Sequence, residues 1–226
     1  MCDDVHLPER VRSRGGCLVA EDFPMLNTFD AKSVTWDEDP HRRDMALAIV
    51  TAITQRIPLT KGQRLLDVGC GTGLVGLPLA TMTHSLLGVD ISTGMVERFR
   101  AKIPLSGQAG IQAEVRDLAT APLPAESVDV AVSAMAFHHI VDITAMLHAL
   151  AGSLAQGGWL AIADLESEDG SFHDEPVPHR GFDPGAFLAV MQQVGLTAVS
   201  HERVHVLRKP GKDQGYPIFL AVARKL

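Results

Sequence analysis

Three glycines and one carboxylate form the part of this sequence best suited to bind a ligand. Residues 65–73 read LLDVGCGTG, in which Gly69, Gly71 and Gly73 follow a short apolar run. Because glycine has no Cβ, the backbone can turn sharply there and approach a ligand closely. Asp67 precedes the glycines, and its charge favours a cationic or amino-bearing ligand over a pyrophosphate. The segment therefore predicts a ligand site at the end of a strand.

The residues on either side of these glycines predict the elements that position them. Residues 64–68 are apolar enough for a central parallel strand, and residues 74–80 have a helical pattern. In open α/β sheets, ligands bind at the carboxyl ends of the strands, where helix N-termini direct free N–H groups. We therefore expect a strand, a glycine turn and a helix that together form one wall of the site.

A second acidic residue, Asp90, is compatible with more than one nucleotide-type cofactor. Gly71, Gly73 and Gly76 match the pattern G-x-G-x-x-G, and Asp90 ends the apolar segment 85–90. In a nicotinamide-dependent oxidoreductase, Asp90 would be the acid that binds the ribose. A carboxylate at this position can accept hydrogen bonds from both ribose hydroxyls, whether they belong to a nicotinamide dinucleotide or to another nucleotide-type cofactor.

The LLDVGCGTG segment resembles motif I of the class I S-adenosylmethionine-dependent methyltransferases, and the resemblance extends over residues 29–226. It implies that S-adenosylmethionine is the cofactor and S-adenosylhomocysteine the product. Asp117 and Leu118, after the third predicted strand, correspond by resemblance to adenine contacts. Trp36 either lines the cofactor pocket, as aromatic residues before the first strand do in such enzymes, or anchors a helix to the core. The cofactor-binding residues implied are Asp67, Gly69, Gly71, Gly73, Asp90, Ile91, Asp117, Leu118, Ser133 and Trp36.

Paired histidines follow the fourth predicted strand, in the segment 133–142 that reads SAMAFHHIVD. In the family this exit faces the substrate, so the resemblance implies that His138 and His139 lie beside the reacting groups. An imidazole there can accept a proton from an attacking hydroxyl or amine, or orient the substrate by hydrogen bonding. The alternative is a structural role in the turn.

Residues 166–182 form a long polar segment that we predict to be a mobile substrate lid. It contains His173, Asp174, Glu175 and His179. These residue types can also bind metals, but they lack a fixed ligand spacing such as H-E-x-x-H, so we predict no metal site. A solvated loop without a function is the remaining interpretation.

The chain predicts one α/β domain with a Rossmann-like, mostly parallel seven-stranded sheet and helices on both faces. A short loop joins the last two predicted strands, which makes that pair antiparallel, and the resemblance implies the order 3-2-1-4-5-7-6 with the last strand antiparallel. Residues 1–28 are predicted to be a partly flexible N-terminal arm. Residues 29–226 are predicted to be the methyltransferase domain, including a leading helix at about 40–57.

Composition restricts the partners. The 226 residues carry a net charge of −7 without any run of Lys or Arg, which argues against nucleic acid or an anionic membrane. A small-molecule substrate fits better. The three cysteines form no C-x-x-C pair and no segment is long enough to span a bilayer, so we expect a cytoplasmic protein. A non-catalytic regulatory protein that binds S-adenosylmethionine remains an alternative.

Overall fold

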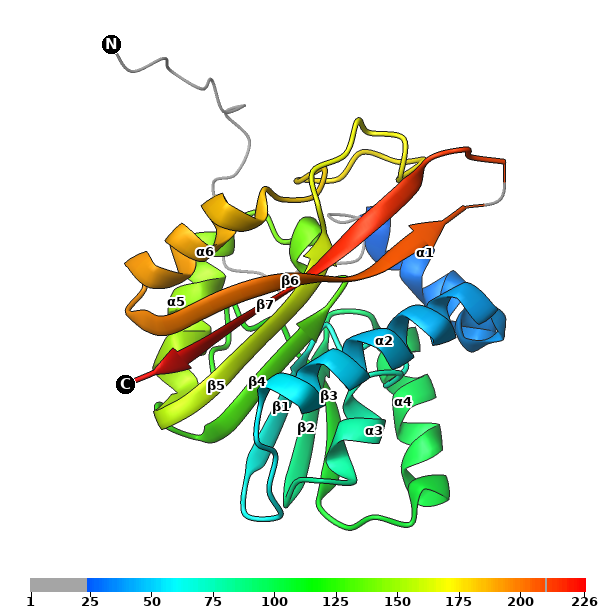
Figure 1. The fold of residues 1–226 in the computed structure, drawn as a ribbon. Helices are drawn as coiled ribbons and strands as arrows, with labels where there is room; N and C mark the ends of the chain where they lie inside the picture. The colour runs from blue at the N-terminus through cyan, green and yellow to red at the C-terminus, as the bar shows by residue number, and fades with distance from the viewer. Residues whose placement is uncertain (1–23, 210) are drawn as a thin grey trace, which may run out of the picture.

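The computed structural model describes residues 24–209 and 211–226, and a twisted sheet runs through its centre (Figure 1). The strands are β1 (Arg64–Val68), β2 (Ser85–Asp90), β3 (Ile111–Val115), β4 (Val128–Ala134), β5 (Leu154–Leu165), β6 (Leu196–Arg208) and β7 (Gly215–Lys225). Their order is β3-β2-β1-β4-β5-β7-β6. The first five strands pair in parallel, and β7 is antiparallel to both β5 and β6. The predicted order and the antiparallel last strand are therefore confirmed.

Helices cover both faces of this sheet, as predicted. They are α1 (Pro24–Lys32), the 3-10 helix η2 (Ser33–Glu38), α2 (Pro40–Arg56), α3 (Gly76–Ala80), α4 (Thr93–Ser106), the 3-10 helix η3 (Phe137–His139), α5 (Ile143–Ser153) and α6 (Pro184–Gln193). Buried side chains of α2, α3 and α4 belong to one hydrophobic core, whereas buried side chains of α5 and α6 belong to the other.

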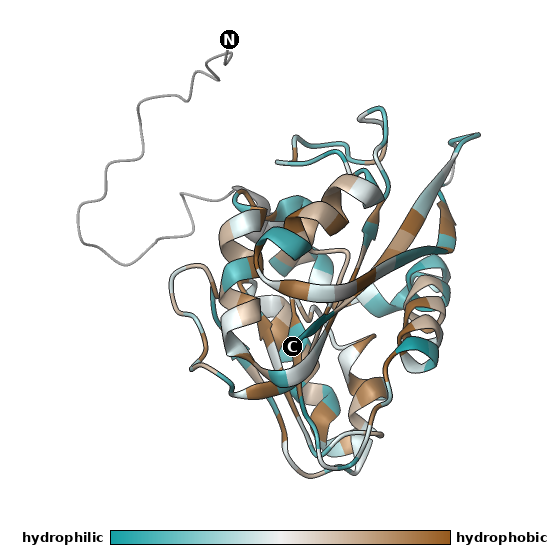
Figure 2. Cartoon of the chain, turned by 60° about the vertical axis from the view of Figure 1, so that its left-hand side comes forward, coloured by the Kyte–Doolittle hydropathy of each residue, from teal (hydrophilic) through white to brown (hydrophobic). Residues whose placement is uncertain are grey.

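Alternation along each strand assigns side chains to these two cores. Leu65 of β1 packs with α2, α3 and α4, and its neighbour Leu66 packs with α5 and α6. Successive side chains of a strand point to opposite faces, so a strand covered on both sides must be apolar throughout. Figure 2 shows the same distribution, with hydrophobic residues along the strands and hydrophilic residues in the loops beyond their ends.

Capping residues define where the helices begin. Asp39 accepts a hydrogen bond from the backbone N–H of His41 at 2.9 Å, with Pro40 in the first turn of α2. An acidic residue followed by proline favours a helix start, and the leading helix predicted at about 40–57 begins here. Residues 24–28, assigned above to the N-terminal arm, belong to α1. The rest of that arm, residues 1–23, lies outside the described residues.

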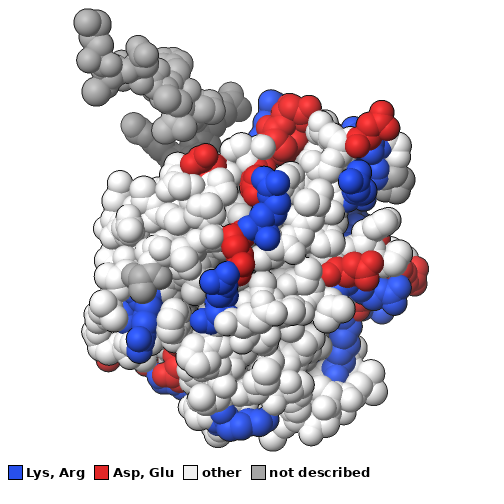
Figure 3. Space-filling view, in the orientation of Figure 1, with Lys and Arg blue, Asp and Glu red and all other residues white. Residues whose placement is uncertain are grey.

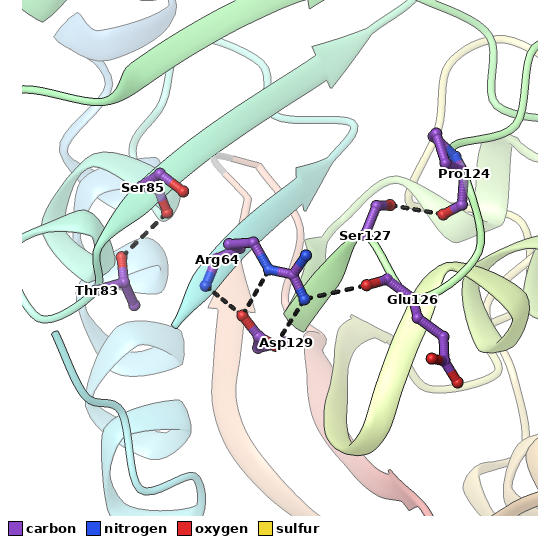
Figure 4. Close-up of polar contacts among 7 residues, drawn as sticks. All are labelled: Arg64, Thr83, Ser85, Pro124, Glu126, Ser127 and Asp129. Atoms are coloured by element: carbon purple, nitrogen blue, oxygen red, sulfur yellow. Dashed lines mark hydrogen bonds and ion pairs between the residues drawn. The ribbon is translucent and has the colours of Figure 1, made fainter. Parts of the chain in front are cut away.

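A polar network joins β1 to β4 at the end of the sheet where both strands begin (Figure 4). The carboxylate of Asp129 accepts from the backbone N–H of Arg64 at 2.7 Å and from two of its guanidinium nitrogens at 2.9 Å. The guanidinium also donates to the carbonyl of Glu126. This ion pair lowers the pKa of Asp129 below its ordinary value. The central strands are thus fixed in register at the end opposite the glycine turn.

The visible surface carries charges of both signs, dispersed among neutral residues (Figure 3). No broad basic patch covers this face. Within residues 24–209 and 211–226, no helix combines the length and the apolar character that a membrane span requires.

Candidate functional site

The glycine turn after β1 adopts the sharp, left-handed geometry that its sequence predicts. Gly69, Gly71 and Gly73 have φ values of 65°, 51° and 88°, in the left-handed region that residues with a Cβ rarely adopt. A Cβ on Gly69 would lie 2.4 Å from the Cβ of Ala136, so Gly69 allows two strand ends to approach each other. A Cβ on Gly71 would meet no described atom within 4 Å. Gly71 therefore faces the space where a ligand can approach the backbone.

Asp67 lies beneath this turn and is 2% exposed. Burial raises the pKa of Asp67 to about 7, the nearby Asp90 carboxylate adds to the rise, and the backbone N–H of Gly76 opposes it. A Cβ at Gly76 would come within 2.4 Å of Asp67 Oδ2. That oxygen has no hydrogen-bond partner among the described residues. A buried acceptor without a donor indicates a position for a ligand or a bound water.

The Asp90 carboxylate, at the end of β2, connects the glycine turn to the next helix. Oδ2 accepts from the backbone N–H of Gly71 and Oδ1 from that of Ser92, each at 2.9 Å. Burial raises the pKa of Asp90, and these two N–H groups partly offset the rise. A carboxylate offers about four lone-pair positions, so two remain for hydroxyl donors. Asp90 is therefore both a structural tie and a candidate ligand-binding group.

The segment before α2 closes over this region, which the sequence did not predict in detail. Asp30 of α1 accepts from the Ser92 hydroxyl at 2.5 Å and from the backbone N–H of Gly94 at 2.8 Å. In η2, Asp37 accepts from the Thr72 hydroxyl at 2.5 Å. These contacts bring residues 30–37 beside the glycine turn and the start of α4. Nothing in the sequence distinguished these two acids from the others in residues 29–40, which read FDAKSVTWDEDP.

Trp36 belongs to the same segment and contacts α2, which is the helix-anchoring role predicted for it. The Arg42 guanidinium lies 3.9 Å from the centre of the indole, which ties Trp36 to α2. Phe29 lies 6.0 Å from Trp36 and 5.1 Å from His139, between ring centres. Phe29 thus connects the segment to the histidines, whereas the cofactor role of Trp36 stays a prediction.

Other predicted cofactor residues lie at the same carboxyl edge of the sheet. The Asp117 carboxylate is partly exposed and accepts from the backbone N–H of Ala119 at 2.9 Å. Leu118 is buried in the core with α5, and Ile91 is half exposed. The Ser133 hydroxyl is buried and donates to the carbonyl of Val68 at 2.8 Å, so it ties β4 to β1. The cofactor role of each stays a prediction.

The exit from β4 places a strained residue next to the glycine turn. Met135 has φ of 57°, which is uncommon for a residue with a long side chain. Strained backbone of this kind concentrates at functional sites. The backbone turn at Met135 leads into η3, where His138 is buried and His139 is partly exposed.

The two predicted catalytic histidines are held by residues from other segments. His138 Nδ1 lies 2.6 Å from Oδ1 of Asp164, a fully buried carboxylate on β5. His138 Nε2 lies 3.1 Å from His173 Nε2. Burial, followed by the charges of neighbouring histidines, lowers the pKa of His139 to about 3 and that of His173 to about 4. Both rings are therefore neutral near pH 7. Asp164 was missed, although it lies one residue before the end of β5, much as Asp90 lies at the end of β2.

Of the four predicted lid residues, the structure brings only His173 into this cluster. His179 Nε2 lies 3.0 Å from the carbonyl of Ile140, while Asp174 and Glu175 are exposed. The segment also carries apolar anchors, because Phe172 and Phe182 are each 8% exposed. The prediction of a lid rested on the polar residues of this segment and did not include these two rings. They attach the segment to both cores.

Comparison with known proteins shows which protein family this chain resembles. Residues 66–162, from the glycine turn through the histidine exit into β5, match a family model described as a methyltransferase domain. Over this span the chain carries a methyltransferase domain, and its fold is that of S-adenosylmethionine-dependent methyltransferase structures. Its cofactor is S-adenosylmethionine.

Curated relatives and solved structures agree with this methyltransferase assignment. Aklanonic acid methyltransferase DauC of Streptomyces sp. is 29% identical over 172 residues, which are 73% of this chain and 75% of the relative. The 27-O-demethylrifamycin SV methyltransferase of Amycolatopsis mediterranei is 30% identical, covering 58% of this chain and 49% of the relative. Several other matches also span about half of the relative's length. A methyltransferase structure from Aquifex aeolicus has a TM-score of 0.66 at 22% identity, covering 87% of this chain and 98% of that one.

The residues of this methyltransferase suit the chemistry of the cofactor. S-adenosylmethionine carries a sulfonium and an ammonium, and both Asp67 and Asp90 have a pKa that burial raises. No ion pair engages either carboxylate within the described part of the chain. A cation bound nearby favours the charged form of such carboxylates. Asp67, Asp90 and the open side of Gly71 therefore fit the cofactor.

Asp67 leads to a prediction about pH and stability. Its pKa rises from 3.8 to about 7 on folding, so between these values the unfolded chain releases a proton that the folded chain keeps. The cofactor-free protein should lose stability as pH rises through this window, by roughly 2 kcal/mol between about pH 5 and about pH 7. Asp67→Asn should remove that loss. Urea unfolding of both proteins at about pH 5 and about pH 8 measures it.

Asp129→Asn is the matched control for Asp67→Asn. The pKa of Asp129 is lowered, so its stabilisation is fully present above its unfolded pKa near 3.8. Its removal should cost the same at about pH 5 and about pH 8. An Asp67→Asn protein whose stability relative to wild type is equal at the two pH values would contradict a raised pKa at Asp67.

Proposed function

We propose that this methyltransferase transfers the methyl group of S-adenosylmethionine to an oxygen of a small-molecule acceptor. One observation carries the proposal: the histidine cluster lies against Phe29, whose neighbour Asp30 bonds Ser92 and Gly94, just after Asp90. Groups suited to an acceptor and groups suited to the cofactor are thus adjacent along one segment. The names of the two antibiotic-related relatives also support a small-molecule acceptor, one of them an oxygen acceptor.

The surroundings of the cluster favour an acceptor with an aromatic or apolar body and a polar group. Phe29 and Phe172 present ring edges to His139 and His173, with ring centres 5.1 and 4.6 Å apart. Such rings pack against an apolar scaffold, while imidazole nitrogens can receive a hydroxyl proton or orient the hydroxyl. Methyl transfer requires mainly alignment and exclusion of water, so few dedicated catalytic groups are needed.

Residues 166–182 are proposed to form the acceptor side of the site. His173 reaches the cluster, and His179 donates its backbone N–H to the carbonyl of His138 at 3.2 Å. The Glu166 carboxylate pairs with Arg203 of β6 at 2.6 Å, and Phe172 anchors the middle of the segment. Asp174 and Glu175 lie exposed between these anchors, where they can meet a bound acceptor. This arrangement favours a segment that moves between fixed points.

Binding and turnover measurements test the proposed function. Calorimetric titration of the purified chain with S-adenosylhomocysteine should give binding, whereas NAD should give none. With isotopically labelled S-adenosylmethionine, label should enter hydroxyl-bearing aromatic small molecules and leave DNA, RNA and bulk protein unlabelled. Transfer only to a macromolecule would contradict the acceptor class. Cofactor binding without turnover on a broad metabolite extract would favour a regulatory protein.

A further inference from the structure

Three imidazole groups lie close together between the exit from β4, the segment after β5 and helix α1. His138 and His139 come from η3, and His173 comes from residues 166–182. One ring nitrogen from each lies within 4.8 Å of the other two. His138 Nε2 and His173 Nε2 are 3.1 Å apart. Since 35 residues separate His138 from His173 in sequence, no short spacing motif reveals the cluster.

We propose that His138, His139 and His173 bind one divalent transition-metal ion of the zinc class. Zinc–nitrogen bonds are about 2.0–2.1 Å long, so two ligand nitrogens in a tetrahedral site lie about 3.3 Å apart. The 3.1 Å between His138 and His173 already matches this separation. The remaining nitrogen needs to approach by about 1.5 Å at most, which a side-chain rotation provides.

A buried carboxylate orients the first ligand. Asp164 Oδ1 lies 2.6 Å from His138 Nδ1, and Oδ2 accepts the backbone N–H of the same histidine. With its proton held at Nδ1, the His138 ring presents the Nε2 lone pair to the cluster. Metal-bound histidines usually donate their second nitrogen to a carboxylate or carbonyl in this way. Asp164 is thus a positioning residue for the proposed site.

Unpartnered nitrogens in the other two rings support a bound cation. His139 Nδ1 and His173 Nδ1 are buried and have no hydrogen-bond partner among the described residues. The direct contact between His173 Nε2 and His138 Nε2 employs one nitrogen of each of these two rings and does not involve His139. A metal ion would bind one nitrogen of each ring at once. Rotation of a ring on metal binding would also place its other nitrogen toward a different neighbouring acceptor.

The donor set selects the class of metal. Imidazole nitrogens suit zinc, copper, iron and nickel, whereas magnesium and calcium prefer oxygen ligands. The positive charges of Lys32 and Lys209 act on this cluster and oppose a cation, while Asp164 favours it. Three histidines leave a fourth position for water or another oxygen. That this oxygen belongs to the acceptor rests on the proposed function, whereas metal binding itself does not.

This proposal departs from the sequence-based expectation of no metal site. That expectation rested on the missing H-E-x-x-H pattern within 166–182. The cluster instead takes a single ligand from that segment and two from η3.

Cobalt titration of the full chain without a histidine tag tests the proposed site. After treatment with a chelator, the wild-type protein should bind one Co²⁺ per chain with visible absorption bands of a four-coordinate complex, and Zn²⁺ should displace it. His139→Ala and His173→Ala should each weaken binding at least roughly 100-fold, and Asp164→Asn roughly 10- to 100-fold. His148→Ala is the matched control, because His148 is exposed on α5 and should leave binding unchanged.

Folding and cofactor binding are measured on the same variants. Circular dichroism and S-adenosylhomocysteine affinity should match the wild type in His139→Ala and His173→Ala. Absence of the cobalt bands in wild type, or unchanged Co²⁺ affinity in these folded variants, would overturn the metal site and leave methyl transfer standing. A wild-type protein that binds Co²⁺ but does not bind S-adenosylhomocysteine would overturn the proposed function and leave the metal site standing.

Discussion

Asp90→Ala should weaken S-adenosylhomocysteine binding by roughly 10²- to 10⁴-fold. We expect the two unoccupied acceptor positions of the Asp90 carboxylate to bind the ribose hydroxyls, and each hydrogen bond to a charged acceptor contributes roughly 1.5–3 kcal/mol. The carboxylate also accepts from the backbone N–H groups of Gly71 and Ser92, so the turn itself loosens in the variant. Titration calorimetry measures the affinity, and urea unfolding separates it from stability.

Two further variants make the Asp90 result specific. Asp90→Asn keeps the shape and one acceptor oxygen, so its loss of affinity should be intermediate. Asp44→Ala removes an exposed carboxylate from α2 and should leave the affinity unchanged. Unchanged affinity in a folded Asp90→Ala protein would remove Asp90 from the cofactor site.

The position of the proposed cofactor-binding residues was predictable because its signals are local. Asp67, the three glycines and Asp90 each lie at the end of an apolar strand, and parallel strands bring those ends to one edge. The antiparallel β6–β7 pair follows from a loop too short for a crossover. The helix caps Asp39 and Asp183 follow from an acid before proline. Each of these signals fits within one or two neighbouring elements.

The acceptor half depends on contacts between distant segments. Asp164 and His173 reach His138 from β5 and from the segment after it, 26 and 35 residues away. Asp30 reaches Ser92 over 62 residues. A polar residue on such a segment has the same sequence signature whether it meets solvent or another side chain. Fold topology identifies the strand ends, but loop conformation determines which loop residues converge.

The segment 166–182 illustrates the same limit on a smaller scale. Its many ionisable residues indicated a polar lid, and near its two ends Gly170 and Gly181 have positive φ values of 93° and 72°. Phe172 nevertheless packs into the core beside Tyr216, with ring centres 5.0 Å apart. A single aromatic ring can bury enough apolar surface to anchor a loop, and composition alone does not show which ring does so.

The two glycines Gly69 and Gly71 should separate a structural role from a ligand-binding role. Both have positive φ, so valine strains the backbone at either position by roughly 1–2 kcal/mol. At Gly69 the new Cβ would also meet Ala136 at 2.4 Å, which adds roughly 1–3 kcal/mol of overpacking. Gly69→Val should therefore lower the free energy of unfolding by roughly 2–5 kcal/mol, as urea denaturation would show.

Gly71→Val should have the opposite balance of effects. A Cβ at Gly71 meets no described atom within 4 Å, so only the strain of the positive φ reduces stability. The isopropyl group would instead occupy the space through which the cofactor approaches the backbone, and affinity for S-adenosylhomocysteine should fall by at least roughly 100-fold. Gly107→Val is the matched control, because Gly107 has φ of 65° and open space at the far end of α4. If Gly71→Val binds the cofactor as well as Gly107→Val does, the cofactor does not approach the backbone at Gly71.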